Sequence, residues 1–268
     1  MSETLLSFTV LTLFTDMIKQ NMNTSIMGRA LEKGIIGLDV IDIRDYSCNK
    51  HNRVDDYPYG GGAGMLMEAE PVYKACEAAK SLHPGRKKRL IYLSPIGRTF
   101  TQDIAKELST EENLIFLCGH YEGIDERVLE NEVDDYISLG DFVLTGGEIP
   151  ALAIMDAVAR LIPGVLNNDE SAGEESFENG LLEYPQYTRP ELFLDRQVPE
   201  VLLSGHHENI RLWRFAQSLI RTNRYRPDML KGYILTDDRK KQLKKFIKTD
   251  ILSENEKILL SEALKSIG

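Results

Sequence analysis

The stretch from Asn113 to Glu148 constrains the fold most, because two short apolar runs within it each end at a glycine. The runs are Leu114–Cys118 and Tyr136–Leu139, and each is followed by small or polar residues and then by a helical pattern. Short apolar runs bounded by turn residues are typical of buried strands in a parallel sheet. Because ligands of such sheets bind beyond the carboxyl ends of the strands, this stretch predicts a binding site.

The first 163 residues alternate between strand and helix patterns. Apolar or alternating segments predict strands over residues 5–13, 39–44 and 89–93, and amphipathic or apolar segments predict helices over 68–82, 100–108 and 148–161. Thr99 is the expected N-cap of the helix over 100–108. This alternation predicts an α/β domain over residues 1–166 with a mostly parallel sheet.

The rest of the chain has a different composition. Residues 164–183 contain six acidic residues and no basic ones, which favours an acidic flexible linker or lid over residues 167–183, although a plain solvated connector has the same composition. Helical patterns then cover 207–224, 236–248 and 254–266, and Ser253 with Glu256 forms a capping box for the last. No strand is evident, so residues 184–268 are expected to form a small helical domain.

Positive charge is concentrated in that helical domain. The whole chain has a net charge of −10, yet twelve Lys and Arg stand against four Asp and Glu between Gly205 and Lys248. The overall charge argues against a non-specific nucleic-acid coat protein. The local excess, with Trp213, Phe215 and Tyr225 interleaved among the arginines, favours contacts to the phosphates of a nucleic acid over a merely solvated helix face.

A glycine-rich loop over Tyr59–Met65 has two interpretations. Four glycines in five residues predict either a flexible loop or a backbone that touches a ligand directly. The spacing matches neither a P-loop nor the GxGxxG of dinucleotide-binding folds. From spacing alone both interpretations stay open.

The numbers and spacing of cysteine and histidine indicate the redox compartment and whether a metal site is expected. The three cysteines are scattered without CxxC spacing, and the five histidines show no metal-ligand spacing, so we expect a reducing compartment and no metal site. The apolar run over residues 5–14 lacks a basic leader and is interrupted by polar residues, and no run approaches the length of a membrane helix. A cytoplasmic protein without membrane contact is therefore expected.

Three functional classes fit these parts to different degrees. An enzyme that modifies RNA or DNA with a nucleotide-like cofactor explains both the glycine turns and the basic domain. A Rossmann oxidoreductase is the competing enzyme class, and it lacks the GxGxxG motif after the first strand. A non-catalytic RNA-binding module leaves Glu122, Arg160 and Glu175 without a role.

Eight motifs in order resemble the bacterial tRNA (guanine-37-N1)-methyltransferases, the TrmD family of SPOUT methyltransferases. They cover the chain from the first strand to about residue 226, and together they are very specific. The motifs are YGGGAGM (59–65), YLSPIGR (92–98), LCGHYEGIDERV (117–128), SLGDFVLTGGE (138–148), RLIPGVL (160–166), EESF (174–177), GLLEYPQYTRP (180–190) and VPEVLLSGHHENIRLWR (198–214).

The resemblance implies a trefoil knot formed by the segments after Leu93, Cys118 and Ser138. It also implies an obligate homodimer whose active sites contain residues of both chains. S-adenosylmethionine would bind inside the knot. Carried over by motif, its contacts are Tyr92, Leu93, Ser94, Pro95, Gly119, Leu139, Gly140, Asp141, Phe142, Val143, Leu144, Gly146 and Gly147.

The reaction requires a proton acceptor, because N1 of guanine carries a hydrogen that must leave as the methyl group arrives. The resemblance places Glu175 at the position of the family's linker Asp, and its neighbour Glu174 is an alternative base. Arg160 would stabilise charge on the guanine O6, although a cation at a helix end is also favoured by the helix dipole. Glu122 would hold the base edge or the sulfonium centre.

The implied substrate is the anticodon stem-loop of tRNA, with guanosine 37 splayed into the site. Mg²⁺ would bind only together with tRNA. Three residues depart from the family pattern: His120 replaces Arg, Ala63 replaces Pro, and Glu175 replaces Asp. Substrate contacts are expected from Tyr59, Gly60, Gly61, Gly62, His120, Arg189, Arg211 and Arg214.

Overall fold

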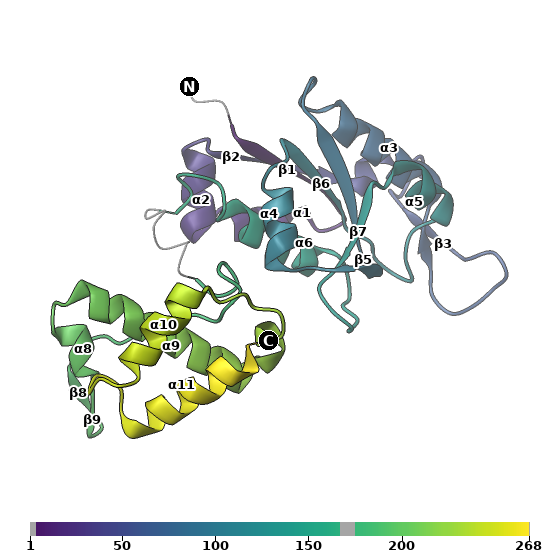
Figure 1. The fold of residues 1–268 in the computed structure, drawn as a ribbon. Helices are drawn as coiled ribbons and strands as arrows, with labels where there is room; N and C mark the ends of the chain where they lie inside the picture. The colour runs from purple at the N-terminus through teal and green to yellow at the C-terminus, as the bar shows by residue number, and fades with distance from the viewer. Residues whose placement is uncertain (1–3, 167–174, 268) are drawn as a thin grey trace. The chain divides into compact units, whose positions relative to one another are not determined.

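The computed structural model describes residues 4–166 and 175–267, and the chain forms two compact units (Figure 1). The first unit is Met1–Asp169 and the second is Glu170–Gly268, and each is described by itself. Most of the expected linker, including Glu174, lies outside the described residues. No helix in the described ranges has the length and apolar character needed to cross a membrane.

A parallel sheet of five strands forms the centre of the first unit, as the alternation of strands and helices predicts. Its order is β2-β1-β6-β5-β7, and all four neighbouring pairs are parallel. The strands are β1 (Leu6–Thr12), β2 (Ile36–Asp42), β5 (Lys88–Thr99), β6 (Asn113–Leu117) and β7 (Asp135–Ser138).

Helices cover both faces of this sheet (Figure 1). Side chains of a strand alternate between faces, so Phe8 and Val10 of β1 belong to one core and Leu11 to the other. Every residue of β1 is buried, as is typical of a strand in a sheet covered on both sides. The first core contains α1 (Thr15–Met22), α2 (Ser25–Glu32), α4 (Gln102–Leu108) and α6 (Glu148–Ala159), and the second contains α3 (Ala69–Ser81) and α5 (Glu126–Glu132).

Strand β5 continues to Thr99, beyond Leu93 where the predicted strand ends. Both Leu93 and Arg98 pair with Ile137 of β7, so residues 94–97 loop out between them. A Cβ on Gly97 would lie 2.4 Å from the backbone nitrogen of Ile137, so only glycine permits this approach. The expected trefoil knot involves these segments and stays a prediction.

Two boundaries differ from the predictions for local reasons. The second strand was expected over residues 39–44, but it ends at Asp42, whose side chain accepts from the Arg44 backbone and starts η1 (Ile43–Tyr46). Helix α4 is capped by Thr101, not by Thr99 as expected, because Thr99 still pairs with Ser138 in the sheet.

The glycine-rich loop connects two very short strands. β3 (Asp55–Asp56) and β4 (Leu66–Met67) pair antiparallel. A β-bridge joins Met67 to Ile124, which anchors this ribbon beside the loop that follows β6.

The second unit is helical, and it consists of α8 (Glu200–Leu203), α9 (His207–Tyr225), η2 (Pro227–Leu230), α10 (Asp237–Phe246) and α11 (Glu254–Ser266) around the buried Trp213. The predicted capping box of Ser253 and Glu256 is confirmed. The expectation of no strand is wrong, since β8 (Leu192–Phe193) pairs with β9 (Arg196–Gln197). Strands of two residues are too short to show a period of alternation.

Residues 175–183 are the part of the expected linker that the structure describes, and they pack against the helices of the second unit. Leu181 is buried in its core, the Leu182 backbone donates to Thr222 Oγ1 at 2.9 Å, and the Glu183 backbone donates to Ser176 Oγ at 2.9 Å. Residues 175–183 are therefore held by the helical unit.

Candidate functional site

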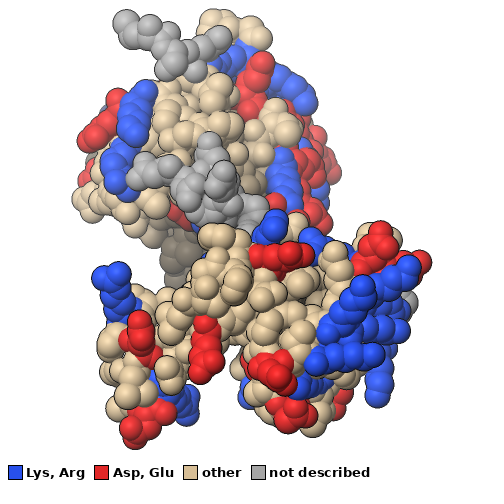
Figure 2. All heavy atoms as spheres, turned by 60° about the vertical axis from the view of Figure 1, so that its left-hand side comes forward, with Lys and Arg blue, Asp and Glu red and all other residues tan. Residues whose placement is uncertain are grey.

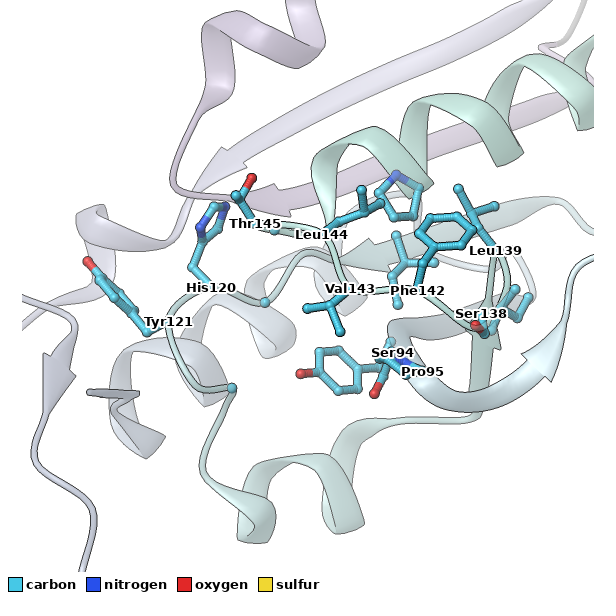
Figure 3. A pocket seen from close by; sticks show the side chains of 18 of the residues that line it. Ser94, Pro95, His120, Tyr121, Ser138, Leu139, Phe142, Val143, Leu144 and Thr145 are labelled. Atoms are coloured by element: carbon cyan, nitrogen blue, oxygen red, sulfur yellow. The ribbon is translucent and has the colours of Figure 1, made fainter. Parts of the chain in front are cut away.

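The carboxyl ends of β5, β6 and β7 surround one cavity of about 280 Å³ in the first unit. Figure 3 shows Ser94 and Pro95 from the first segment, His120 and Tyr121 from the second, and Phe142–Thr145 from the third around it. These are the three segments in which the resemblance to the TrmD family places the site. Their convergence follows from the sheet order, because β6, β5 and β7 are neighbours.

Most of the residues that the resemblance assigns to the cofactor line this cavity. They are Tyr92, Leu93, Ser94, Pro95, Gly119, Leu139, Gly140, Phe142, Val143, Leu144, Gly146 and Gly147. Asp141 is exposed and is not among the described residues that line the cavity. The prediction missed Tyr121, Gly123, Ile137, Ser138, Thr145 and Pro150, which flank the predicted residues.

The lining carries little charge. Among the described residues, His120 and Glu122 are its only members with a carboxyl or imidazole group, and no Lys or Arg contributes to it. Burial raises the pKa of the Tyr92 phenol, so this hydroxyl stays neutral and can donate a hydrogen bond. Such a cavity suits a ligand without phosphate groups better than a dinucleotide.

His120 reaches a buried carboxylate at the edge of the cavity. Its Nε2 lies 2.8 Å from Glu148 Oε2, and Thr12 Oγ1 donates to Glu148 Oε1 at 2.5 Å. A Cβ on Gly146 would lie 2.3 Å from the His120 ring, so glycine at this position makes the contact possible. The sequence predicts a substrate contact for His120, and the structure gives it this partner within the protein.

Aromatic rings enclose the same imidazole. The Phe14 ring centroid is 4.8 Å from that of His120, and the Tyr121 centroid is 6.4 Å away. Thr12 and Phe14 follow the first strand, and nothing in the sequence indicates that β1 and β6 are neighbours. Glu148 belongs to the GGE motif, so the motif could have identified this residue, but not its partners.

The glycine-rich loop packs against Glu122. The Glu122 backbone donates to Met65 O at 3.0 Å, and a Cβ on Gly64 would lie 2.4 Å from Glu122 Cγ. Tyr59 is fully exposed, and Gly60, Gly61 and Gly62 have positive φ with open space around them. The end of the loop therefore positions Glu122, while its tip faces solvent.

The other predicted catalytic residues lie elsewhere in the chain. Arg160 is the C-cap of α6, roughly 18 Å along the helix from Glu148 at about 1.5 Å per residue, and it is not among the described residues of the cavity lining. Glu175 belongs to the second unit, where it lines a separate cavity.

Basic side chains gather on one side of the second unit (Figure 2, lower right). Of the arginines predicted to contact RNA, Arg189 and Arg211 are exposed, and the Arg214 guanidinium carbon lies 4.8 Å from the centroid of the Tyr184 ring. Arg211 and Arg214 are three residues apart in α9, so their side chains are neighbours on the helix surface.

Comparisons with known proteins identify the family of this chain. A family model described as "tRNA (Guanine-1)-methyltransferase TrmD" matches residues 6–232. A tRNA (guanine-N(1)-)-methyltransferase of Lachnospira eligens is 57% identical over 231 residues, 85% of this chain and 97% of the relative. A protein of the same name from Lachnoclostridium phytofermentans is 50% identical over an alignment of 277 positions, which covers 94% of this chain and 99% of the relative. Another, from Clostridium botulinum strain Kyoto, is 57% identical over 239 residues, 89% of this chain and 98% of the relative.

Proposed function

Because the chain belongs to the TrmD family of tRNA (guanine-1)-methyltransferases, we propose that it transfers the methyl group of S-adenosylmethionine to N1 of guanosine 37, next to the tRNA anticodon. The observation that carries this proposal is the cavity where three strand-end segments meet without a Lys or Arg among the described lining residues.

The composition of the cavity fits the donor. S-adenosylmethionine supplies an electrophilic methyl group on a cationic sulfur, and it has no phosphate groups. Leu93, Leu139 and Leu144 offer an apolar surface for an adenine ring, and the carboxylate of Glu122 lines the same cavity. A fixed positive charge there would repel the sulfonium. Described lining residues that include one carboxylate and no Lys or Arg therefore favour binding of the cationic donor.

A carboxylate is the natural acceptor for the N1 hydrogen of guanine. We assign this role to Glu175, which retains the carboxylate of the family's Asp and lies on a described segment that packs on the second unit. Glu122, which the Gly64–Met65 backbone holds beside the first cavity, would face the sulfonium centre or the base edge.

The position of Arg160 supports an active site made from residues of two chains. A residue at the far end of a twelve-residue helix cannot reach the cavity at the near end of that helix. If Arg160 stabilises negative charge on the guanine O6, it does so in the cavity of a second copy. The proposed assembly is therefore a homodimer with shared active sites.

The second unit would hold the anticodon stem-loop. Arg189, Arg211 and Arg214 would contact phosphates, which favours binding of any RNA helix and makes the affinity fall with salt. Among the described residues no group of three or more His, Cys, Asp or Glu could hold a metal ion, so Mg²⁺ used in the reaction would take ligands from the bound tRNA.

Methyl transfer from radiolabelled S-adenosylmethionine tests the proposal. Transcripts of one tRNA with G or A at position 37 are incubated with the full chain, and the labelled nucleoside is identified after digestion. The expected product is N1-methylguanosine from the G37 transcript alone. Labelling of the A37 transcript, or of G37 at another atom, would contradict the assignment.

A further inference from the structure

The second unit contains a cavity that none of the functions proposed above uses. It has a volume of about 720 Å³, within the range of roughly 300–1,000 Å³ typical of ligand sites. It lies between α8, the first half of α9 and the segment that joins α10 to α11 (Figure 1). All of its described lining residues belong to the second unit.

The cavity is acidic, although the neighbouring helices α9 and α10 are rich in Lys and Arg. Glu200, Asp250 and Glu256 bring three carboxylates to its described lining, which contains no Lys or Arg. The Glu256 carboxylate already accepts hydrogen bonds from Ser253 and Gln217. Glu200 and Asp250 are exposed, and their carboxylates have no ion pair or hydrogen bond within the part of the chain that the structure describes. Both are therefore available to a cation.

The indole of Trp213 provides a hydrogen-bond donor at the same cavity. Trp213 lines it and is 1% exposed, and its N–H has no hydrogen-bond partner among the described residues. Nε1 is not one of the fully enclosed atoms that lack a partner, so the small accessible surface of this residue reaches the nitrogen. Because a buried indole N–H usually has a partner, this donor points to a ligand that carries an acceptor.

These groups together select the class of ligand. The two carboxylates attract a cation, and the described residues hold no group of three or more His, Cys, Asp or Glu that could bind a metal ion, which favours an organic cation. A polyamine carries the charge but offers no acceptor to the indole, and the carboxylates would repel RNA phosphates. A Lys or Arg residue of a peptide supplies both features, because its side chain is cationic and its backbone carbonyl oxygen accepts hydrogen bonds.

We propose that this cavity binds a basic segment of a partner protein. A Lys or Arg side chain of the partner pairs with Glu200 and Asp250, and a backbone carbonyl of the partner accepts from Trp213 Nε1. The partner and tRNA use different side chains of the second unit, since the carboxylates keep phosphates away from this cavity. The inference does not depend on methyl transfer, because none of these three residues has a role in the proposed reaction.

Tryptophan fluorescence tests the proposal, because Trp213 is the only tryptophan of the chain. The full chain is titrated with an acetylated and amidated tripeptide that has arginine at its centre. The same peptide with citrulline keeps the shape but lacks the charge. The arginine peptide should change the fluorescence saturably, and the citrulline peptide should bind about tenfold more weakly, the loss expected for one charge-assisted hydrogen bond.

Substitution of the two carboxylates identifies the site. Glu200→Gln and Asp250→Asn should each weaken binding of the arginine peptide about tenfold. Glu262→Gln is the matched control, because Glu262 is exposed on α11 and is not among the described residues that line the cavity. It should bind the peptide as the wild type does. Spermidine, which has charge but no acceptor, should bind the wild type more weakly than the arginine peptide does.

The midpoint of thermal unfolding and the affinity for anticodon stem-loop RNA serve as folding controls and should not change in the three variants. Equal affinity of the wild type for the arginine and citrulline peptides, or for the arginine peptide and spermidine, would overturn the inference. So would equal losses in Glu200→Gln and Glu262→Gln, or a wild type that does not bind the arginine peptide.

Discussion

His120 Nε2 lies 2.8 Å from Glu148 Oε2, and this pair joins the loop after β6 to the first turn of α6. Glu148 is 3% exposed, and its other carboxylate oxygen accepts from Thr12 at the end of β1. Three segments, two of which line the candidate cavity, therefore share one buried carboxylate. Removing one hydrogen-bond partner of a buried polar group leaves that group without the contact, which costs free energy.

We expect His120→Ala to lower the free energy of unfolding by about 2 kcal/mol, because a buried group that loses its hydrogen-bond partner costs about 1–3 kcal/mol. The loop over residues 119–123 should lose its anchor, so affinity for S-adenosylmethionine should fall as well. Urea unfolding and calorimetric titration measure the two effects. His83→Ala is the control, since its 2.7 Å contact with Asp39 is more exposed and should contribute at most about 1 kcal/mol. Equal losses in both variants would contradict the anchoring role.

Gly64→Ala should reduce turnover through Glu122. The added Cβ would lie 2.4 Å from Glu122 Cγ, and the backbone φ of +89° disfavours alanine. Gly85→Ala is the control that isolates backbone strain from contact with Glu122. Gly85 has a φ of +86°, but nothing lies within 4 Å of a Cβ added there. Both variants should lose roughly 1 kcal/mol of stability from backbone strain, but only Gly64→Ala should lower kcat, by about tenfold or more. Turnover of Gly64→Ala that matches that of Gly85→Ala would show that the position of Glu122 does not matter.

Stability should depend on pH through Glu107. Hydrogen bonds from Arg98 and then from Arg89 lower the pKa of this carboxyl from 4.5 to about 2. Because the folded pKa is depressed, the stabilisation is complete above the unfolded pKa and is lost as pH falls from about 4.5 towards 2. Urea unfolding should show wild type more stable than Glu107→Gln at pH 7, with the difference shrinking in that window. A difference that stays constant down to pH 2.5 would contradict the assignment.

Glu175→Ala should reduce kcat by about 10² to 10⁴, the usual contribution of a general base, with unchanged affinity for S-adenosylmethionine. Glu178→Ala is the matched control on the same segment, and it should keep wild-type turnover. Single-turnover methyl transfer at saturating tRNA measures the effect. If Glu175→Ala turns over normally, the base lies elsewhere and Glu174 is the next residue to substitute.

Mixing two inactive variants tests the shared active site. If Arg160 acts in the cavity of a second chain, a mixed dimer of Glu122→Ala and Arg160→Ala contains one cavity with both residues intact. Combining the two proteins after reversible unfolding should therefore restore methyl transfer. If both residues serve the cavity of their own chain, neither site of the mixed dimer is complete, and the mixture should stay inactive.

Local patterns determined the elements and the position of the site. Apolar runs that stop at glycines predicted β6 and β7 to within about a residue, and the capping box at Ser253 predicted the start of α11. Such features depend on neighbours a few residues away, so they can be read from the sequence. The resemblance to the TrmD family, carried over motif by motif, named most of the residues that line the cavity.

Contacts between distant segments were decided only by the tertiary structure. Thr12 and Glu148 are 136 residues apart, and they meet because β1 lies beside β6, an order that no local pattern specifies. The cap of α4 moved from Thr99 to Thr101 because pairing with Ser138 extended β5. The sequence by itself determined which residues are chemically able to act, whereas sheet order and strand pairing decided which of them share a cavity, because those depend on burial of the whole chain.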